Sequence, residues 1–167
     1  LPAPQLCVGR YGPAGEKLDP MMRYPYPNWT PIGGWRIDPS LVYAHSLQES
    51  AFRTSVISGA GARGLMQVKP TTAQEMARAR GAFLSANDLD RPSVNLEYGQ
   101  SYIEKLRDMN ATGGLLPKVI AAYNAGPAPI TRWNSGIRDT GDSMLFIESI
   151  PYWETRGYVS IILRNYW

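Results

Sequence analysis

Residues 38–52 read DPSLVYAHSLQESAF, and this stretch combines a helix start, an apolar helix and a single acidic residue near the helix end. Aspartate followed by proline is typical of a helix start, because the aspartate side chain accepts hydrogen bonds from free backbone N–H groups and proline fits the first helical position. The pattern predicts a helix from Asp38 to about Phe52, ending before the glycine-rich loop at 58–61. Glu49 lies near the carboxyl end of this helix, after several apolar residues.

Glu49 is the candidate general acid of the chain. The negative end of a helix dipole and apolar neighbours both raise the pKa of a carboxyl group, and a general acid must be protonated near neutral pH. Position alone fits a surface glutamate near a helix end better than a catalytic one. The following loop adds support, because residues 50–74 contain no acid, while Gly59, Gly61 and Gly64 lead into Leu65-Met66-Gln67. Neutral amides over an apolar floor are typical of sites that hold sugars and N-acetyl groups.

Further helix signals run along the chain and predict a mostly α (α+β) fold. Thr72 and Glu75 have capping-box spacing, and Gly81 is placed to stop the helix that they open. Other helices are expected from Pro92 to about Asn110, from Pro117 to Gly126-Pro127, over 143–149 and over 152–164. At most a small β element is expected, near 55–68. Residues 1–37 contain seven prolines and predict an extended arm or linker, so the expected division is an arm at 1–37 and a catalytic domain at 38–167.

Composition limits the class of protein. The chain has 167 residues, of which 44% are hydrophobic and 19% charged, so it is expected to form one core and no disordered, collagen-like or coiled-coil structure. No apolar run is long enough to cross a membrane. The net charge of +3 favours an anionic partner. The basic residues are scattered along the chain, which argues against nucleic-acid binding.

The chain lacks the residues that several kinds of catalysis require. A single cysteine, Cys7, cannot form an internal disulfide or a cysteine-ligated zinc module. The only histidine, His45, lies within a predicted helix and is expected to be packed there, and no nucleophile elbow accompanies it. No metal-ligand spacing, P-loop or dinucleotide fingerprint is present. We therefore expect neither a metal nor a cofactor.

Five motifs in order carry a family resemblance. They are Glu49-Ser50-Ala51-Phe52, Gly64-Leu65-Met66-Gln67, Ala121-Ala122-Tyr123-Asn124-Ala125-Gly126-Pro127, Phe146-Ile147-Glu148-Ser149-Ile150-Pro151 and Glu154-Thr155-Arg156-Gly157-Tyr158-Val159. This arrangement, over about residues 35–167, resembles the catalytic domain of soluble lytic transglycosylases of the glycoside hydrolase family 23 type. The resemblance implies a lysozyme-like helical domain that cleaves the β-1,4 bond between N-acetylmuramic acid and N-acetylglucosamine in peptidoglycan glycan strands. It also implies an extracytoplasmic location, most naturally the periplasm, and a place in a longer chain.

The resemblance also implies roles for individual residues. Glu49 protonates the glycosidic oxygen, and its carboxylate then removes the proton of the muramic C6 hydroxyl, giving a 1,6-anhydro ring. The predicted substrate-binding residues are Ser58, Met66, Gln67, Tyr123, Asn124, Glu148 and Tyr158. Met66 is expected to line the cleft, and Glu148 to bind substrate without acting as a second acid. Packing of the last helix explains Tyr158 as readily as a site role.

Two departures from related patterns bear on the reaction. Goose-type lysozymes, which are similar, carry an aspartate after a Gly-Leu-Met-Gln-Val stretch and another in the preceding loop, whereas this chain has Lys69 and the acid-free loop. A base that activates water is therefore missing, which favours transglycosylation over hydrolysis. The alternatives are a goose-lysozyme-like hydrolase and a peptidoglycan-binding or scaffolding domain without turnover. Lys69 faces either an acidic stem peptide or solvent.

Overall fold

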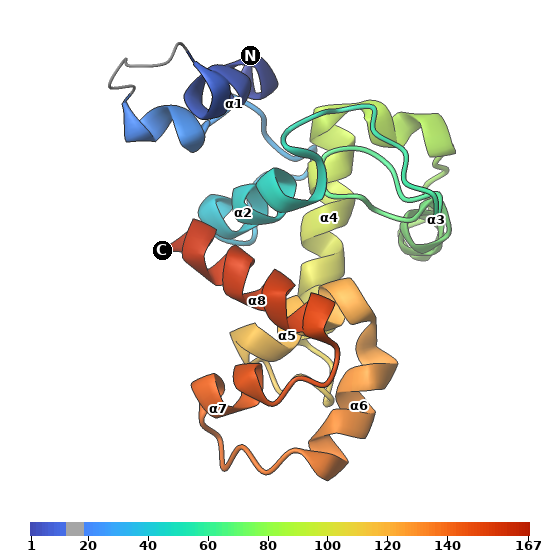
Figure 1. Ribbon diagram of the computed structural model, residues 1–167. Coiled ribbons are helices and arrows are strands. Elements are labelled where there is room, and N and C mark those ends of the chain that lie inside the picture. Colours follow the sequence, from blue (N-terminus) through green and yellow to red (C-terminus); the bar gives the residue numbers. More distant parts are fainter. Residues whose placement is uncertain (13–18) are drawn as a thin grey trace. The chain divides into compact units, whose positions relative to one another are not determined.

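The computed structural model describes residues 1–12 and 19–167 (Figure 1). The ordered elements of this part are almost entirely helical. In chain order they are α1 (Pro2–Tyr11), the 3-10 helix η1 (Pro20–Arg23), α2 (Pro39–Ser50), α3 (Pro70–Ala79), the 3-10 helix η2 (Ala86–Asp90), α4 (Pro92–Arg107), α5 (Leu116–Ala125), α6 (Pro127–Gly136), α7 (Ser143–Glu148) and α8 (Trp153–Tyr166). The predicted mostly α fold is confirmed.

The small β element expected near 55–68 consists of two isolated antiparallel bridges. Arg63 pairs with Ile57 and with Val68. Neither bridge extends into a strand within the described residues, because the loop turns back on itself after one pair on each side. None of the helices in the described ranges combines the length and the apolar character that crossing a bilayer requires.

The first part of the predicted extended arm is helical, so that expectation is wrong for residues 2–11. Pro2 and Pro4 occupy the first turn of α1, where backbone N–H groups have no partner within the helix and proline is tolerated. Pro13 lies outside the described residues. The later part of the arm contacts α2, because the Tyr43 hydroxyl lies 2.9 Å from the Pro27 carbonyl oxygen and 3.0 Å from that of Trp29. The expected domain boundary after residue 37 stays a prediction.

Most helix starts agree with the sequence, and the differences have local causes. Asp38 caps α2 by accepting from the Ser40 N–H at 2.8 Å. The helix ends at Ser50 and not at Phe52, because Ala51 adopts a left-handed conformation. The capping box predicted at Thr72 is not formed, since α3 begins two residues earlier with a proline in its first turn. The helix α6 begins at Pro127, where the sequence predicts a helix stop and no new helix.

The chain divides into two compact units, residues 1–99 and 100–167, and α4 contributes to both. In the first unit, Glu97 on α4 is only 6% exposed and joins three segments. Its carboxylate accepts from the Gly33 N–H at 3.0 Å, from Arg36 at 2.9 Å and from Arg80 at 2.9 Å. Burial alone would raise the pKa of Glu97, but these hydrogen bonds outweigh burial and lower it. The cluster therefore fixes the end of the arm and the end of α3 to α4.

The second unit is built around α5, which packs against α6, α7 and α8. The helix is apolar along most of its length, and Ile120, Ala121 and Ala122 are fully buried. Small alanines let neighbouring helices approach closely. On α4, Ile103 and Leu106 are buried as well. This packing places the carboxyl end of α5, which carries Tyr123 and Asn124, beside the start of α8.

Candidate active site

Glu49 is half-buried in the last turn of α2, as predicted, and the chain reverses sharply after it. Ala51 and Phe52 follow with φ angles of 51° and 60°. The Ala51 N–H reaches the carbonyl oxygens of Leu47 and Ser46, and Phe52 is buried against Tyr43, with ring centroids 6.1 Å apart. Two successive non-glycine residues in the left-handed region are costly, so packing must hold them there. The reversal leaves Glu49 at the helix terminus with the acid-free loop directly after it.

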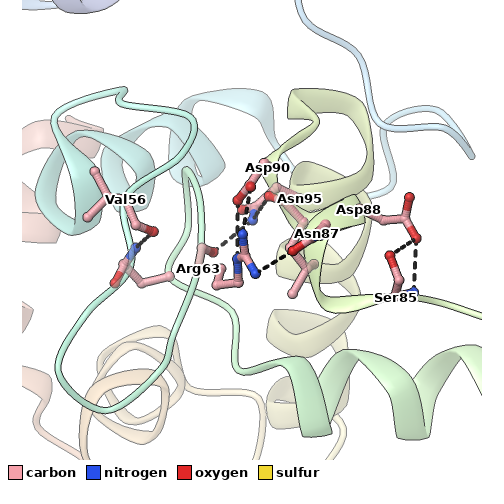
Figure 2. Close-up of polar contacts among 9 residues, drawn as sticks. Val56, Arg63, Ser85, Asn87, Asp88, Asp90 and Asn95 are labelled. Carbon is pink, nitrogen blue, oxygen red and sulfur yellow. Dashed lines mark hydrogen bonds and ion pairs between the residues drawn. The ribbon is translucent and has the colours of Figure 1, made fainter.

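The loop after Glu49 is held by side chains from η2 and α4 (Figure 2). Arg63 makes a two-pronged ion pair with Asp90, with nitrogen–oxygen distances of 2.7 and 3.2 Å, and donates to the Asn87 side chain at 2.9 Å. Asn95 is fully buried and donates to the carbonyl oxygens of Arg63 and Leu89, both at 2.8 Å, while accepting from the Met66 N–H at 2.8 Å. These contacts predefine the loop shape before any ligand arrives.

Gln67 is half-buried, and its backbone and side chain are both constrained. Its φ angle is 48°. The described ranges contain four non-glycine residues with positive φ, and three of them, Ala51, Phe52 and Gln67, flank this loop. The side-chain amide nitrogen of Gln67 donates to the carbonyl oxygens of Val56 and Gly64, at 3.1 and 3.0 Å. Those two bonds fix the amide orientation and leave its oxygen as an acceptor. Backbone strain of this kind clusters at functional sites.

Ser58 closes the tip of the same loop. Its hydroxyl oxygen accepts from the Ala62 N–H at 3.1 Å, and its backbone N–H donates to the Ala62 carbonyl at 2.9 Å. The hydroxyl proton is therefore left to donate to another acceptor. Glu49, Ser58 and Gln67 thus lie on one segment, 49–67, whose loop portion is closed by backbone bonds such as Gly64 N–H to Val56 O at 2.9 Å.

Met66 does not line a cleft in this structure, and the prediction of that role is corrected. Its side chain is fully buried, and a Cβ atom at Gly99 of α4 would overlap the Met66 sulfur. A glycine 33 positions away makes the space that this side chain fills. Met66 is a packing residue, which supports the loop from below.

In the second unit, Tyr123 and Asn124 lie on the last turn of α5, as predicted. Tyr123 is half-buried and contacts the Tyr102 ring, with centroids 5.3 Å apart. Asn124 is exposed, and its side-chain oxygen accepts from the Thr155 hydroxyl of α8 at 2.7 Å. This bond from Thr155 holds the amide of Asn124 in one orientation. Burial raises the pKa of Tyr102, so the ring that contacts Tyr123 remains neutral.

Glu148 and Tyr158 differ in exposure. Glu148 ends α7 with an exposed side chain, while its backbone carbonyl accepts from Arg156 at 3.0 Å. Its carboxylate is therefore accessible, as a binding role requires. Tyr158 is 6% exposed on α8, and packing of this last helix accounts for it.

His45 is confirmed as a packed helix residue. It is 1% exposed, and its Nδ1–H donates to the Leu41 carbonyl at 2.8 Å. Burial lowers the pKa of His45 to about 4, so the ring is neutral near pH 7. The described residues contain no group of three or more histidine, cysteine, aspartate or glutamate side chains that could hold a metal ion.

Most acidic side chains of the first unit have structural tasks. Asp19 and Asp38 cap helices, Asp88 forms a capping box with Ser85, Asp90 pairs with Arg63, and Glu97 binds two arginines. Two other acids of this unit are described. Glu75 is exposed on α3, and Glu49 is half-buried beside the strained reversal. Sequence reasoning missed Asn95, Arg63 and Asp90 as positioning residues, because their partners lie about thirty residues away.

The fold and these motifs define a lytic transglycosylase domain of the lysozyme-like helical type. The family model for the transglycosylase SLT domain matches residues 32–146, which is more than half of the chain, and the chain belongs to this family. The soluble lytic murein transglycosylase of Escherichia coli K12 is 36% identical over 132 residues, covering 78% of this chain and 20% of the relative. A membrane-bound lytic murein transglycosylase C from Actinobacillus pleuropneumoniae is 38% identical over 104 residues, covering 58% of this chain and 28% of the relative.

Solved structures agree with this assignment. The 70-kDa soluble lytic transglycosylase of Escherichia coli superimposes with a TM-score of 0.75 at 32% identity, over 87% of this chain and 24% of that one. An inactive glutamate-to-glutamine mutant of the lytic transglycosylase Slt from Pseudomonas aeruginosa gives 0.76 at 31% identity, over 97% and 26%. A complex of the 70-kDa soluble enzyme with bulgecin A gives 0.71 at 34%, over 78% and 21%. The chain spans about a fifth of the length of the soluble relatives that it matches.

Proposed function

We propose that this domain is a peptidoglycan lytic transglycosylase in which Glu49 is the only catalytic carboxyl group. The observation that carries the proposal is the position of Glu49, half-buried at the end of α2 and followed by a constrained loop without any acid. A relative of the same family is inactive when one glutamate is changed to glutamine, which supports a glutamate-dependent reaction. The substrate places the protein outside the cytoplasm, where peptidoglycan lies.

The proposed reaction uses one group twice. The Glu49 carboxylic acid protonates the glycosidic oxygen as the bond from that oxygen to C1 of N-acetylmuramic acid breaks, with help from the carbonyl of the sugar's own N-acetyl group. The muramic C6 hydroxyl then attacks C1, and the Glu49 carboxylate accepts the hydroxyl proton. Glu49 ends protonated again, and the product carries a 1,6-anhydro ring. No water enters, so no second carboxylate is needed, unlike in enzymes with paired acids.

The neutral groups of the constrained loop suit substrate binding. The Gln67 side-chain oxygen accepts, and the Ser58 hydroxyl donates, so the loop offers both kinds of partner to sugar hydroxyl and acetamido groups. In the second unit, we assign substrate contacts to Tyr123, Asn124 and the exposed carboxylate of Glu148. Tyr158 is buried, and its contribution is to hold α8 in place.

The first prediction concerns Glu49→Gln, assayed by mass spectrometry of the muropeptides that the domain releases from purified peptidoglycan. The unaltered domain should release products lighter by one water than those of a lysozyme. Glu49→Gln should lower their release by about a hundredfold or more, since loss of a general acid typically costs that much. Glu75→Gln is the matched control, because Glu75 is an exposed glutamate of the same unit and its replacement should leave release unchanged.

Other outcomes would point to the alternatives. Products with full-mass reducing ends would mean that water attacks, as in a goose-lysozyme-like hydrolase. Equal activity of Glu49→Gln and the unaltered domain would sink the assignment of the acid. Absence of products from all three proteins, with binding to insoluble peptidoglycan intact, would indicate a binding or scaffolding domain.

A further inference from the structure

The acid-free segment 50–74 carries an unbalanced positive charge. It contains three cations, Arg53, Arg63 and Lys69. Asp90 neutralises Arg63 through the two-pronged ion pair that Figure 2 shows. Arg53 and Lys69 are exposed, and no carboxylate of the described residues pairs with either of them. Positive charge therefore remains on the surface of this segment and favours an anionic group of a ligand.

The side chain of Arg53 is held in place by the backbone of the reversal that follows α2. The chain reverses at Ala51 and Phe52. The carbonyl oxygen of Ser50 then accepts twice from Arg53, from its backbone N–H at 3.1 Å and from its Nε–H at 3.0 Å. These two bonds fold the side chain over the carboxyl end of α2. Because Ser50 directly follows Glu49, the guanidinium lies at the same helix end as the proposed acid.

The contact with Ser50 uses only part of the guanidinium. The Nε–H satisfies a carbonyl oxygen at the helix end, where a positive charge is also favourable. The terminal nitrogens Nη1 and Nη2 form another edge of the planar group, and they make no hydrogen bond to any residue that the structure describes. This edge presents two parallel N–H donors, which match the two oxygens of a carboxylate. Helix capping thus explains the position of Arg53 and leaves this edge without a task.

We propose that Arg53 is a specificity-determining residue, whose Nη edge binds a free carboxylate of a stem peptide on the bound glycan strand. In intact strands the lactyl group of muramic acid is joined to the peptide by an amide bond, so the free carboxylates belong to the peptide. Arg53 distinguishes a charged stem peptide from a neutral one, while Glu49 acts on the sugar. The inference rests on the proposed function, because the stem peptide is part of the same peptidoglycan substrate.

The test measures calorimetric binding in the Glu49→Gln background, so that cleavage does not deplete the ligand. The probes are two forms of the same soluble glycan strands, one with unmodified stem peptides and one whose peptide carboxylates have been converted to amides. The peptides are not removed, because removal would expose the lactyl carboxylate and supply another anion. The background protein should bind the unmodified strands roughly fivefold more tightly, since a two-pronged contact lies near the upper end of exposed ion pairs.

The ratio of the two affinities separates recognition from a structural role of Arg53. Arg53→Gln should bind both strand forms equally, and Arg53→Lys should keep only part of the preference, because it retains the charge but lacks the planar fork. Arg78→Gln is the matched control and should keep the full preference, since Arg78 is an exposed arginine of α3 in the same unit. Loss of the helix cap alone would weaken binding of both forms alike and leave their ratio unchanged.

The remaining outcomes separate this proposal from the proposed function. A full preference in Arg53→Gln, or an equal loss of preference in Arg78→Gln, would overturn the role of Arg53. Loss of the preference in Lys69→Gln alone would assign the carboxylate contact to Lys69 and would also overturn it. Absence of binding to either strand form would contradict both proposals. Cleavage by Glu49→Gln would refute the catalytic proposal alone, because the preference would then be measured from cleavage rates and would still depend on Arg53.

Discussion

At the scale of single residues, Gly64 carries two constraints at once. Its φ angle is +73°, and a Cβ atom there would overlap the side-chain nitrogen of Asn95 and the carbonyl oxygen of Leu89. Both neighbours are held by the hydrogen bonds that fix the loop, so neither can move away cheaply. The backbone must therefore lie close to η2 and α4, and only glycine permits this approach. The position of Gln67 depends on the same contact, because its amide bonds the Gly64 carbonyl.

Two glycine substitutions separate these constraints. Gly61 has a φ angle of +75°, and a Cβ atom added there would meet nothing within 4 Å, so Gly61→Ala should cost only the left-handed penalty, about 1 kcal/mol. Gly64→Ala adds the steric overlap and should cost about 3 kcal/mol or more. Urea denaturation gives both free energies of unfolding. Similar costs for the two variants would show that the loop can shift away from Asn95.

At the scale of elements, the Glu97 cluster ties the arm, α3 and α4 into one unit. Glu97→Gln removes the charge that faces Arg36 and Arg80 and should lower the free energy of unfolding by about 2 kcal/mol near pH 7. That is less than for a fully buried pair, because both arginines are partly exposed. Asp108→Asn removes one exposed ion pair with Arg107, which water and salt screen, and should cost much less. Equal losses would mean that the cluster adds no more than a surface pair.

The stability difference between the unaltered protein and Glu97→Gln should depend on pH with a definite sign. A carboxyl group whose pKa is lowered in the folded state stabilises the fold above its ordinary pKa, and this contribution is lost as the pH falls through the lowered value. The stability difference between the unaltered protein and Glu97→Gln should therefore hold down to about pH 4 and narrow only below it. A difference that narrows already near neutral pH would contradict the assigned role.

The positions of the prolines explain which helices could be predicted from the sequence and which could not. The starts of α2 and α4 follow from proline in the first turn, together with a cap or an apolar repeat. The helices α1 and α6 each carry prolines at their first and third positions, which looked like an extended segment and a helix stop. Both prolines lie in the first turn, where no intrahelical N–H bond is lost. A run of prolines near a start therefore does not exclude a helix.

The candidate site was predicted only as far as local motifs reach. Glu49 at the helix end and Tyr123 and Asn124 on the last turn of α5 follow from helix spacing. The burial of Met66 depends on Gly99, and the hydrogen bond that holds the Met66 backbone comes from Asn95. The left-handed backbone of Gln67 leaves no mark in its residue type. Contacts between residues about thirty positions apart decide these features, and no local pattern encodes them.

At the scale of the whole molecule, the loss of folding stability at low pH follows from groups that the fold holds in one charge state. Glu97 is an ionised partner of two arginines, whereas His45 is kept neutral inside α2. Both lie in the first unit. Acid acts against this arrangement in two stages, because histidine ordinarily gains its proton at a higher pH than carboxylates do. The first stage should therefore belong to His45 alone.

The last prediction tests this stage through the free energy of unfolding of the unaltered protein and His45→Gln between about pH 7.5 and pH 4. The His45 pKa is lowered from 6.5 to about 4 in the folded protein, so above pH 6.5 the ring is neutral in both states and contributes no slope. Between these values the unfolded chain binds a proton that the folded protein excludes, and stability falls as the pH drops, by about 3 kcal/mol in all. Below the folded value both states are protonated and the loss stops growing. His45→Gln has no titrating group at this position, so its curve should lack this fall, whatever the packing cost of the glutamine at neutral pH. Parallel curves for the two proteins would show that the imidazole is not held neutral.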